Sequence, residues 1–148
     1  MQEEYFFCMA KDPREMALGI LARRDYSVRE MKTKLARKNL SAEAIADTVV
    51  WLMQKRLLND AEFAQKRAEA IFRTKMVGPR AIDSKLREAG ISEMIRTNVV
   101  ENLASQEQWN ARADKAIVSW KKIHPKHAND TVRMMRFLAS RGFEGRYK

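Results

Sequence analysis

The sequence predicts an all-α protein made of three tandem three-helix repeats that resemble helix–turn–helix units. Its 148 residues are rich in helix formers and contain only five Gly and three Pro, whereas β proteins need frequent turn residues. Apolar residues recur at helical spacing, and the same helix starts and stops return about every 51 residues. Because three short helices bury little apolar surface alone, we expect the repeats to stack into an elongated, curved array.

The repeat is most visible around the second helix of each copy. The matching positions are Ser27, Met31, Leu35 and Asn39 in the first copy, Gly78, Ile82, Leu86 and Gly90 in the second, and Asp130, Met134, Leu138 and Gly142 in the third. The last residue of each set stands where helices commonly end in a left-handed conformation, which Gly and Asn adopt at low cost. Three copies therefore share one stop signal.

The first repeat is expected to hold three helices. The first covers about residues 14–24, with Ala17, Leu18, Leu21 and Ala22 on its buried side. The second begins after the N-cap Ser27, with Val28, Met31 and Leu35 facing inward and Arg29, Thr33 and Arg37 facing outward. The third begins after Ser41 and buries Ile45, Val49, Leu52 and Met53.

The second and third repeats follow the same plan. Asp60 is the expected N-cap of the next helix, which carries Phe63, Ala64, Ile71 and Phe72. Pro79 suits the first turn of the helix after Gly78, and Ser92 caps a helix with Ile95, Val99, Val100 and Leu103. We expect an N-terminal extension at residues 1–13, repeat one at 14–58, repeat two at 59–105 and repeat three at 106–148.

The chain carries a formal charge of +10, which favours a polyanionic partner. Residues 14–58 have a net charge of +5 and residues 106–148 of +6, while residues 59–105 are nearly neutral. The predicted partner- or DNA-binding residues lie in the two basic regions: Arg23, Arg24, Arg29, Lys34, Arg37, Lys121, Lys122, Arg133, Arg136 and Arg141. The alternative is a basic surface that serves solubility only.

Other chemistry-bearing residues favour structural roles. Trp109 and Trp120 share one helical face with Ala113, Ala116 and Ile117, which indicates core packing rather than base stacking, and Trp51 is also expected in the core. The pair His124 and His127 lacks further metal ligands at suitable spacing. We therefore expect no catalytic residue, metal or cofactor.

The chain shows no feature of export or membrane insertion. Cys8 is the single cysteine, so no internal disulfide can form, and we expect an inert thiol there rather than a reactive one. Residues 5–10 are apolar but follow acidic residues and are too short for a signal peptide. No apolar stretch approaches the roughly 20 residues that span a bilayer. A cytoplasmic protein with no membrane contact is expected.

These motifs together resemble one family. Asp60-x-x-Phe63-Ala64, followed by Gly78-Pro79-x-x-Ile82-x-x-x-Leu86-x-x-x-Gly90-Ile91, resembles the central motif of the RecX family. The segments Ser27-x-x-Glu30-Met31-x-x-Lys34-Leu35 and Arg136-Phe137-Leu138-x-x-Arg141-Gly142-Phe143 resemble its first and last repeats. The likeness covers about residues 14–143. Residues 1–13 match nothing in the family.

The resemblance implies a bacterial regulator that binds in the groove of the RecA recombinase filament on DNA. Such a protein inhibits ATP hydrolysis by the recombinase, strand exchange and filament growth. It is not an enzyme, acts as a monomer and binds free single- or double-stranded DNA only weakly and non-specifically. Relatives continue into a final helix, whereas this sequence has five residues after Phe143, so the third repeat is expected to be incomplete.

Two other functions remain open from the residues alone. A helix–turn–helix protein without a recombinase partner would use the same basic helices to bind duplex DNA, with affinity that falls steeply with salt. An enzyme with an unrecognised site is the third possibility, and turnover of a nucleotide or nucleic-acid substrate would reveal it.

Overall fold

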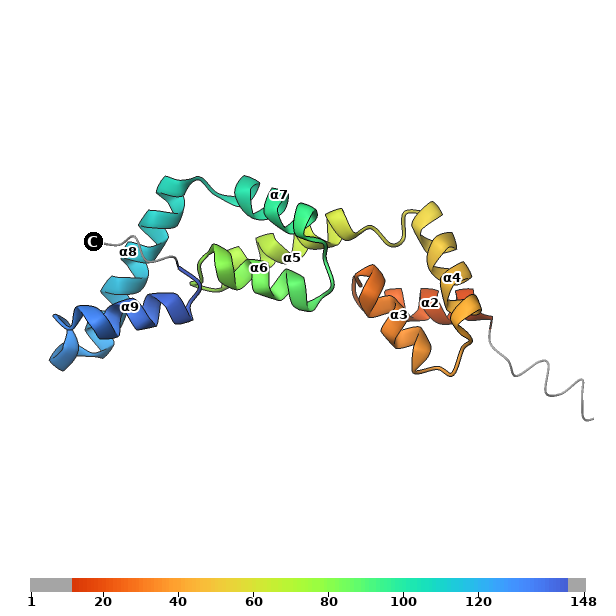
Figure 1. Ribbon diagram of the computed structural model, residues 1–148, viewed down its shortest axis with the longest axis horizontal. Helices are drawn as coiled ribbons and strands as arrows, with labels where there is room; N and C mark the ends of the chain where they lie inside the picture. The colour runs from red at the N-terminus through yellow and green to blue at the C-terminus, as the bar shows by residue number, and fades with distance from the viewer. Residues whose placement is uncertain (1–11, 144–148) are drawn as a thin grey trace, which may run out of the picture. The chain divides into compact units, whose positions relative to one another are not determined.

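A computed structural model describes residues 12–143, and this part of the chain is helical with no strand (Figure 1). The predicted all-α class is confirmed. The elements in order are α2 (Pro13–Leu21), α3 (Val28–Ala36), α4 (Ala42–Gln54), α5 (Asp60–Thr74), α6 (Pro79–Glu88), α7 (Glu93–Leu103), α8 (Gln106–Ile123), the 3-10 helix η1 (Pro125–His127) and α9 (Thr131–Ser140). Cys8 and the rest of residues 1–11 lie outside the described residues, as do residues 144–148.

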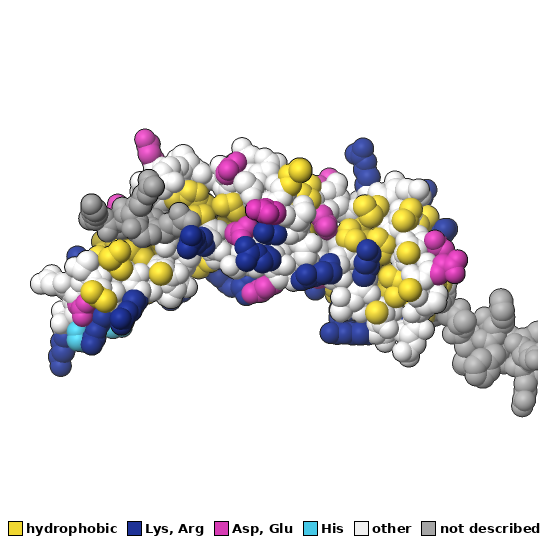
Figure 2. Space-filling model, viewed as in Figure 1, with side chains coloured by type: hydrophobic (Ala, Val, Ile, Leu, Met, Phe, Trp, Pro, Cys, Tyr) yellow, Lys and Arg dark blue, Asp and Glu magenta, His cyan; other side chains and the backbone are white. Residues whose placement is uncertain are grey.

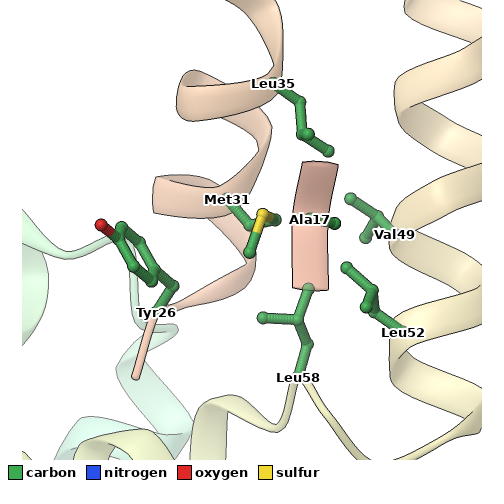
Figure 3. Close-up of a cluster of buried hydrophobic side chains, with 7 residues drawn as sticks. All are labelled: Ala17, Tyr26, Met31, Leu35, Val49, Leu52 and Leu58. Atoms are coloured by element: carbon green, nitrogen blue, oxygen red, sulfur yellow. The ribbon is translucent and has the colours of Figure 1, made fainter. Parts of the chain in front are cut away.

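Contacts divide the chain into two compact units, the first ending at Phe63 and the second beginning at Ala64. In the first unit, α2, α3 and α4 enclose one core (Figure 3). Its buried members are Ala17, Tyr26, Met31, Leu35, Val49, Leu52 and Leu58. Tyr26 comes from the loop after α2, and Leu58 from the segment that precedes α5.

The buried side of α2 differs from the prediction. The helix starts at Pro13, where Asp12 accepts a hydrogen bond from the Arg14 N–H, and it ends at Leu21. Met16 and Ile20 pack against the core, whereas Leu18 is 42% exposed and Ala22 is exposed as well. Apolar residues surround most of α2, so periodicity did not single out the face that meets α3 and α4.

One predicted core residue of α4 is also wrong. Val49 and Leu52 are buried and Ile45 packs beside them, but Met53 is 51% exposed. Successive residues on a helix are separated by about 100°, so Met53 turns away once Leu52 faces the core. Trp51 packs against this core, as predicted.

The predicted helix boundaries are mostly confirmed. Ser27 and Ser41 cap α3 and α4, and Ser92 and Asp130 cap α7 and α9. Asn39, Gly90 and Gly142 all have positive φ, as the shared stop signal predicts. Arg56 also has positive φ (56°), which no local motif indicated.

The predicted N-cap of α5 is wrong. Asn59, not Asp60, accepts a hydrogen bond from the Glu62 N–H (3.2 Å). Asp60 is the first residue of α5, and its Oδ1 accepts a bond from the backbone N–H of Val28 (2.9 Å) at the start of α3. Both residues suit an N-cap, so the sequence alone did not distinguish them.

In the second unit, α8 carries the predicted tryptophan stripe. Trp109, Ala113, Ala116 and Trp120 are all buried, which confirms the core interpretation. The rings of Trp109 and Phe72 pack in a T-shaped arrangement with centroids 5.2 Å apart, and Trp120 stacks on Phe137 of α9. Leu138 and Phe143 of the third repeat form a buried cluster with Ala113 and Ala116 of this stripe.

The start of α6 packs against the turn after α9, backbone to backbone. The Gly78 N–H donates to the Arg141 carbonyl oxygen (2.8 Å), and the Arg80 N–H donates to the carbonyl oxygen of Gly142 (3.1 Å). A Cβ at Gly78 would lie 2.4 Å from that Gly142 oxygen. The second and third repeats are thus joined where both carry glycine.

Candidate partner-binding surface

The predicted basic residues of the first unit occupy three different environments. Arg29 is exposed on α3 and Arg37 is exposed at its C-cap, eight residues later, both on the side opposite the buried Met31 and Leu35. Thr33 lies between them, and its hydroxyl donates to the Arg29 carbonyl oxygen (3.0 Å). This outward face of α3 agrees with the prediction.

Arg23 and Lys34 line a surface hollow of about 500 Å³ between α2 and α3, which we call the α2–α3 hollow. Its lining residues are Glu15, Met16, Gly19, Ile20, Arg23, Tyr26, Lys34 and Lys38. Three cations therefore converge on one concavity that holds a single carboxylate. Among the described residues, none forms an ion pair with Arg23, Lys34 or Lys38.

Arg24 has structural partners instead. Its guanidinium lies over the ring of Tyr26 (3.7 Å to the centroid) and pairs with Glu30 Oε2 (3.1 Å). The same Glu30 oxygen accepts from the Ser27 N–H, while Ser27 Oγ accepts from the Glu30 N–H. Arg24 thus stabilises the position of Glu30 in the capping box that starts α3. Its assignment to a partner surface stays a prediction.

The predicted residues of the second unit lie on α8 and α9. Lys121 and Lys122 are in the last turn of α8, and Arg133 and Arg136 are exposed on α9. Packing of α8 on α9 brings these two segments together, and Figure 2 shows basic side chains and a histidine gathered where α8 ends and α9 begins.

Two of these cations are engaged within the chain. Arg133 pairs with the cap residue Asp130 (3.2 Å), and the Arg141 guanidinium lies 5.6 Å from the Phe137 ring centroid. Lys121, Lys122 and Arg136 form no ion pair among the described residues. Exposed apolar side chains stand beside them, including Val118, Ile123, Val132 and Met135.

One arginine of the nearly neutral middle region bonds within the protein. Arg96 pairs with Asp83 (2.9 Å) and donates to the Ile91 carbonyl oxygen (2.7 Å), which fastens α7 to α6. Both contacts are long-range or loop-mediated, so sequence reasoning did not assign them. A surface role for Arg96 is ruled out by the 11% exposure of its side chain.

Arg112 was likewise missed. Its guanidinium donates to the carbonyl oxygens of Phe72, Lys75 and Val77 and lies over the Phe72 ring (4.1 Å). Burial lowers the pKa of this guanidinium from its usual value. The one sequence signal was its place three residues after Trp109, at the edge of the buried face of α8.

The His124 side chain packs against the preceding turn of α8. Its ring stacks on Trp120 with centroids 5.2 Å apart, and Nδ1 lies 3.1 Å from the Trp120 carbonyl oxygen. Within residues 12–143, no group of three or more His, Cys, Asp or Glu side chains is placed to hold a metal. In the same range, no helix has the length and apolarity to cross a membrane.

Comparison with known proteins identifies two domains in tandem. The family model described as RecX, first three-helix domain, matches residues 14–52, and the one described as RecX, second three-helix domain, matches residues 59–99. The regulatory protein RecX of Chromohalobacter salexigens is 29% identical over 132 residues, covering 89% of this chain and 85% of that protein. The regulatory protein RecX of Pelodictyon phaeoclathratiforme is 30% identical over 128 residues, covering 86% and 79%.

A solved structure has the same fold. The crystal structure of RecX from Lactobacillus salivarius aligns with a TM-score of 0.82, covering 90% of this chain and 87% of that one. Its sequence identity is 18%, so this likeness concerns the fold alone.

Proposed function

The chain belongs to the RecX family of regulatory proteins, and we propose that it binds the RecA recombinase filament on DNA and inhibits it. The inhibited steps are ATP hydrolysis by the recombinase, strand exchange and filament growth. The protein acts in the cytoplasm as a monomer, by occupying a surface of the filament and without chemistry of its own.

The observation that carries this proposal is how the chain uses its cations. Arg96, in the nearly neutral middle region, and Arg112, at the edge of the buried face of α8, bond within the chain. In the two basic regions, Arg37, Lys121, Lys122 and Arg136 are exposed and form no ion pair among the described residues. Surfaces of this kind suit a partner with many phosphates or carboxylates, such as a protein filament on DNA.

The deciding experiment is RecA-dependent ATP hydrolysis on single-stranded DNA, titrated with substoichiometric amounts of the protein. We expect a dose-dependent fall in hydrolysis. An unrelated protein of equal charge serves as the control for non-specific binding to the DNA. Unchanged hydrolysis with the cognate recombinase would overturn the proposal.

The interface residues are tested by charge reversal at positions that have no structural partner to lose. Because Arg24 holds the capping box, we choose Arg37→Glu with Lys34→Glu in the first unit and Lys121→Glu with Arg136→Glu in the second. Each pair should weaken inhibition at least about tenfold with unchanged helical content. The matched control reverses Arg73 and Lys115, which are exposed but outside the predicted surface. Full inhibition by both reversed pairs would remove this surface from the proposal.

A DNA-binding protein without a recombinase partner is the second candidate. It is favoured by the outward face of α3, where Arg29, Thr33 and Arg37 project from the second helix of a three-helix unit. This function requires tight duplex binding in the absence of RecA, with a steep loss of affinity as salt rises. Regulation of the filament instead requires weak binding to free DNA and strong dependence on a preformed filament.

A further inference from the structure

We propose that the α2–α3 hollow binds one nucleotide unit of a single-stranded nucleic acid. Arg23, Lys34 and Lys38 hold the phosphate at the rim, and the base lies against Met16 and Ile20. This inference deepens the proposed function, on whose nucleic-acid partner it rests, because it assigns a binding site within the first unit.

The first observation is the glycine in the wall of the hollow. Gly19 stands within α2, where glycine is the least favourable helix residue apart from proline. A Cβ built there would meet nothing within 4 Å, so no packing inside the described protein requires the missing side chain. A glycine at such a place allows a ligand to approach the backbone closely.

The second observation is the charge of the hollow. Arg23 follows α2, Lys34 lies in the last turn of α3 and Lys38 follows that helix, so the three cations come from two separate segments. Glu15 is the only acidic residue of the lining, and the concavity is therefore net positive. Like charges repel when no anion lies between them, so this arrangement favours a bound anion.

The chemistry of the rest of the lining selects the ligand. Met16, Ile20 and Tyr26 present apolar or aromatic surface beside the cations. A nucleotide combines a phosphate, which matches the cations, with a flat, largely apolar base, which matches the apolar and aromatic lining. A volume of about 500 Å³ is in the range of sites for small ligands and accommodates one such unit.

A single strand fits better than a duplex or an acidic peptide. A duplex keeps its bases stacked inside and would offer the hollow only its backbone, whereas a single strand can splay a base outward. A strand also carries a phosphate at every unit, so it meets further cations as it leaves the hollow, and Arg37 stands directly beside Lys38 in the chain. An acidic peptide would leave the apolar wall without a matching group unless a large apolar side chain accompanied its carboxylate.

The test fills the hollow without changing its charge. Binding of a fluorescein-labelled oligothymidylate at low salt, without recombinase, is measured by anisotropy for Gly19→Gln and for Leu18→Gln. The control residue is the exposed neighbour of Gly19 outside the hollow, and it receives the same side chain. We expect Gly19→Gln to bind at least about tenfold more weakly, with Tm equal to or above that of the wild type because glutamine favours helix more than glycine. Leu18→Gln should bind as the wild type does.

A second pair of variants tests the rim. Lys34→Gln with Lys38→Gln removes two cations from the hollow, and Lys32→Gln with Lys55→Gln removes two exposed cations elsewhere in the first unit. The hollow pair should lower the slope of log affinity against log salt by about 0.7 for each lost phosphate contact. The control pair should change that slope less.

The outcomes separate the ligand classes. Wild-type affinity in Gly19→Gln, absence of oligothymidylate binding by the wild type, or an equal loss of duplex binding would each overturn the inference. Unchanged strand binding together with lost inhibition of the recombinase would overturn it in favour of a protein segment in the hollow. Conversely, a wild type that leaves ATP hydrolysis unchanged, while Gly19→Gln loses strand binding, would refute the proposed function and support the nucleotide site.

Discussion

At the scale of the residue, arginine has different roles on the surface and in the interior of this protein. Arg37 points its charge into solvent, whereas Arg112 satisfies three backbone carbonyl oxygens within the second unit. The sequence revealed where positive charge is concentrated but not which arginines are engaged internally. The partners of Arg112 are 35 to 40 residues away, so no local spacing could indicate them.

Replacement of Arg112 should therefore destabilise the protein rather than weaken partner binding directly. In Arg112→Ala the carbonyl groups of Phe72, Lys75 and Val77 lose a shared charged donor, at a cost of about 2–3 kcal/mol. Arg112→Lys should recover only part of the lost stability, because an ammonium group cannot reproduce the planar, forked donors of a guanidinium. Urea denaturation measures both variants, with the exposed Lys115→Ala on the same helix as control. Equal stability of Arg112→Ala and wild type would show that these bonds contribute nothing net.

Two glycines in ordinary backbone conformations should respond to alanine in opposite directions. Gly78 has φ −90°, but its Cβ would collide with the backbone of Gly142, so Gly78→Ala should destabilise by at least about 2 kcal/mol. Gly19 faces open space within α2, and Gly19→Ala should stabilise by about 0.5–1 kcal/mol. Thermal unfolding of both variants checks the contrast. A shift of the same sign in both would mean that the contact at Gly78 can relax.

At the scale of the element, the sequence predicted hydrogen bonds between residues close in the chain but not those between residues far apart. Ser27, Ser41 and Ser92 act on amides three residues ahead, so the sequence alone identified these helix starts. The carboxylate of Asp60 instead bonds the amide of Val28, 32 residues away, and leaves the cap of its own helix to Asn59. The buried face of α2 was also missed, because it depends on where α3 and α4 lie.

The contact from Asp60 makes the start of α3 depend on the start of α5. Asp60→Ala removes the acceptor of the Val28 N–H and should cost about 1–2 kcal/mol. Asp60→Asn keeps an oxygen acceptor and should cost less. Asp47→Ala, an exposed carboxylate on α4, is the matched control. If Asp60→Ala unfolds at the same denaturant concentration as Asp47→Ala, the bond to Val28 contributes nothing to stability.

At the scale of the whole molecule, the sequence predicted the tandem arrangement because each repeat restates the same caps and stops. It did not predict how the contacts group. The boundary between the two compact units falls after Phe63, inside α5, rather than between one repeat and the next. Leu58 and Asp60 explain this position, since both contact the first unit although they precede or begin the first helix of repeat two.

Because each unit has its own buried cluster, the two should lose structure separately. Leu52→Ala empties a fully buried position of the first core and should destabilise that unit by about 2–5 kcal/mol. Hydrogen exchange should then show faster exchange in α2, α3 and α4, with protection retained in α6 and α8, because local unfolding follows contact density. The reciprocal variant Leu138→Ala, in the core of the second unit, should give the opposite pattern. An equal loss of protection in every helix for either variant would instead mean that the chain unfolds as one cooperative body.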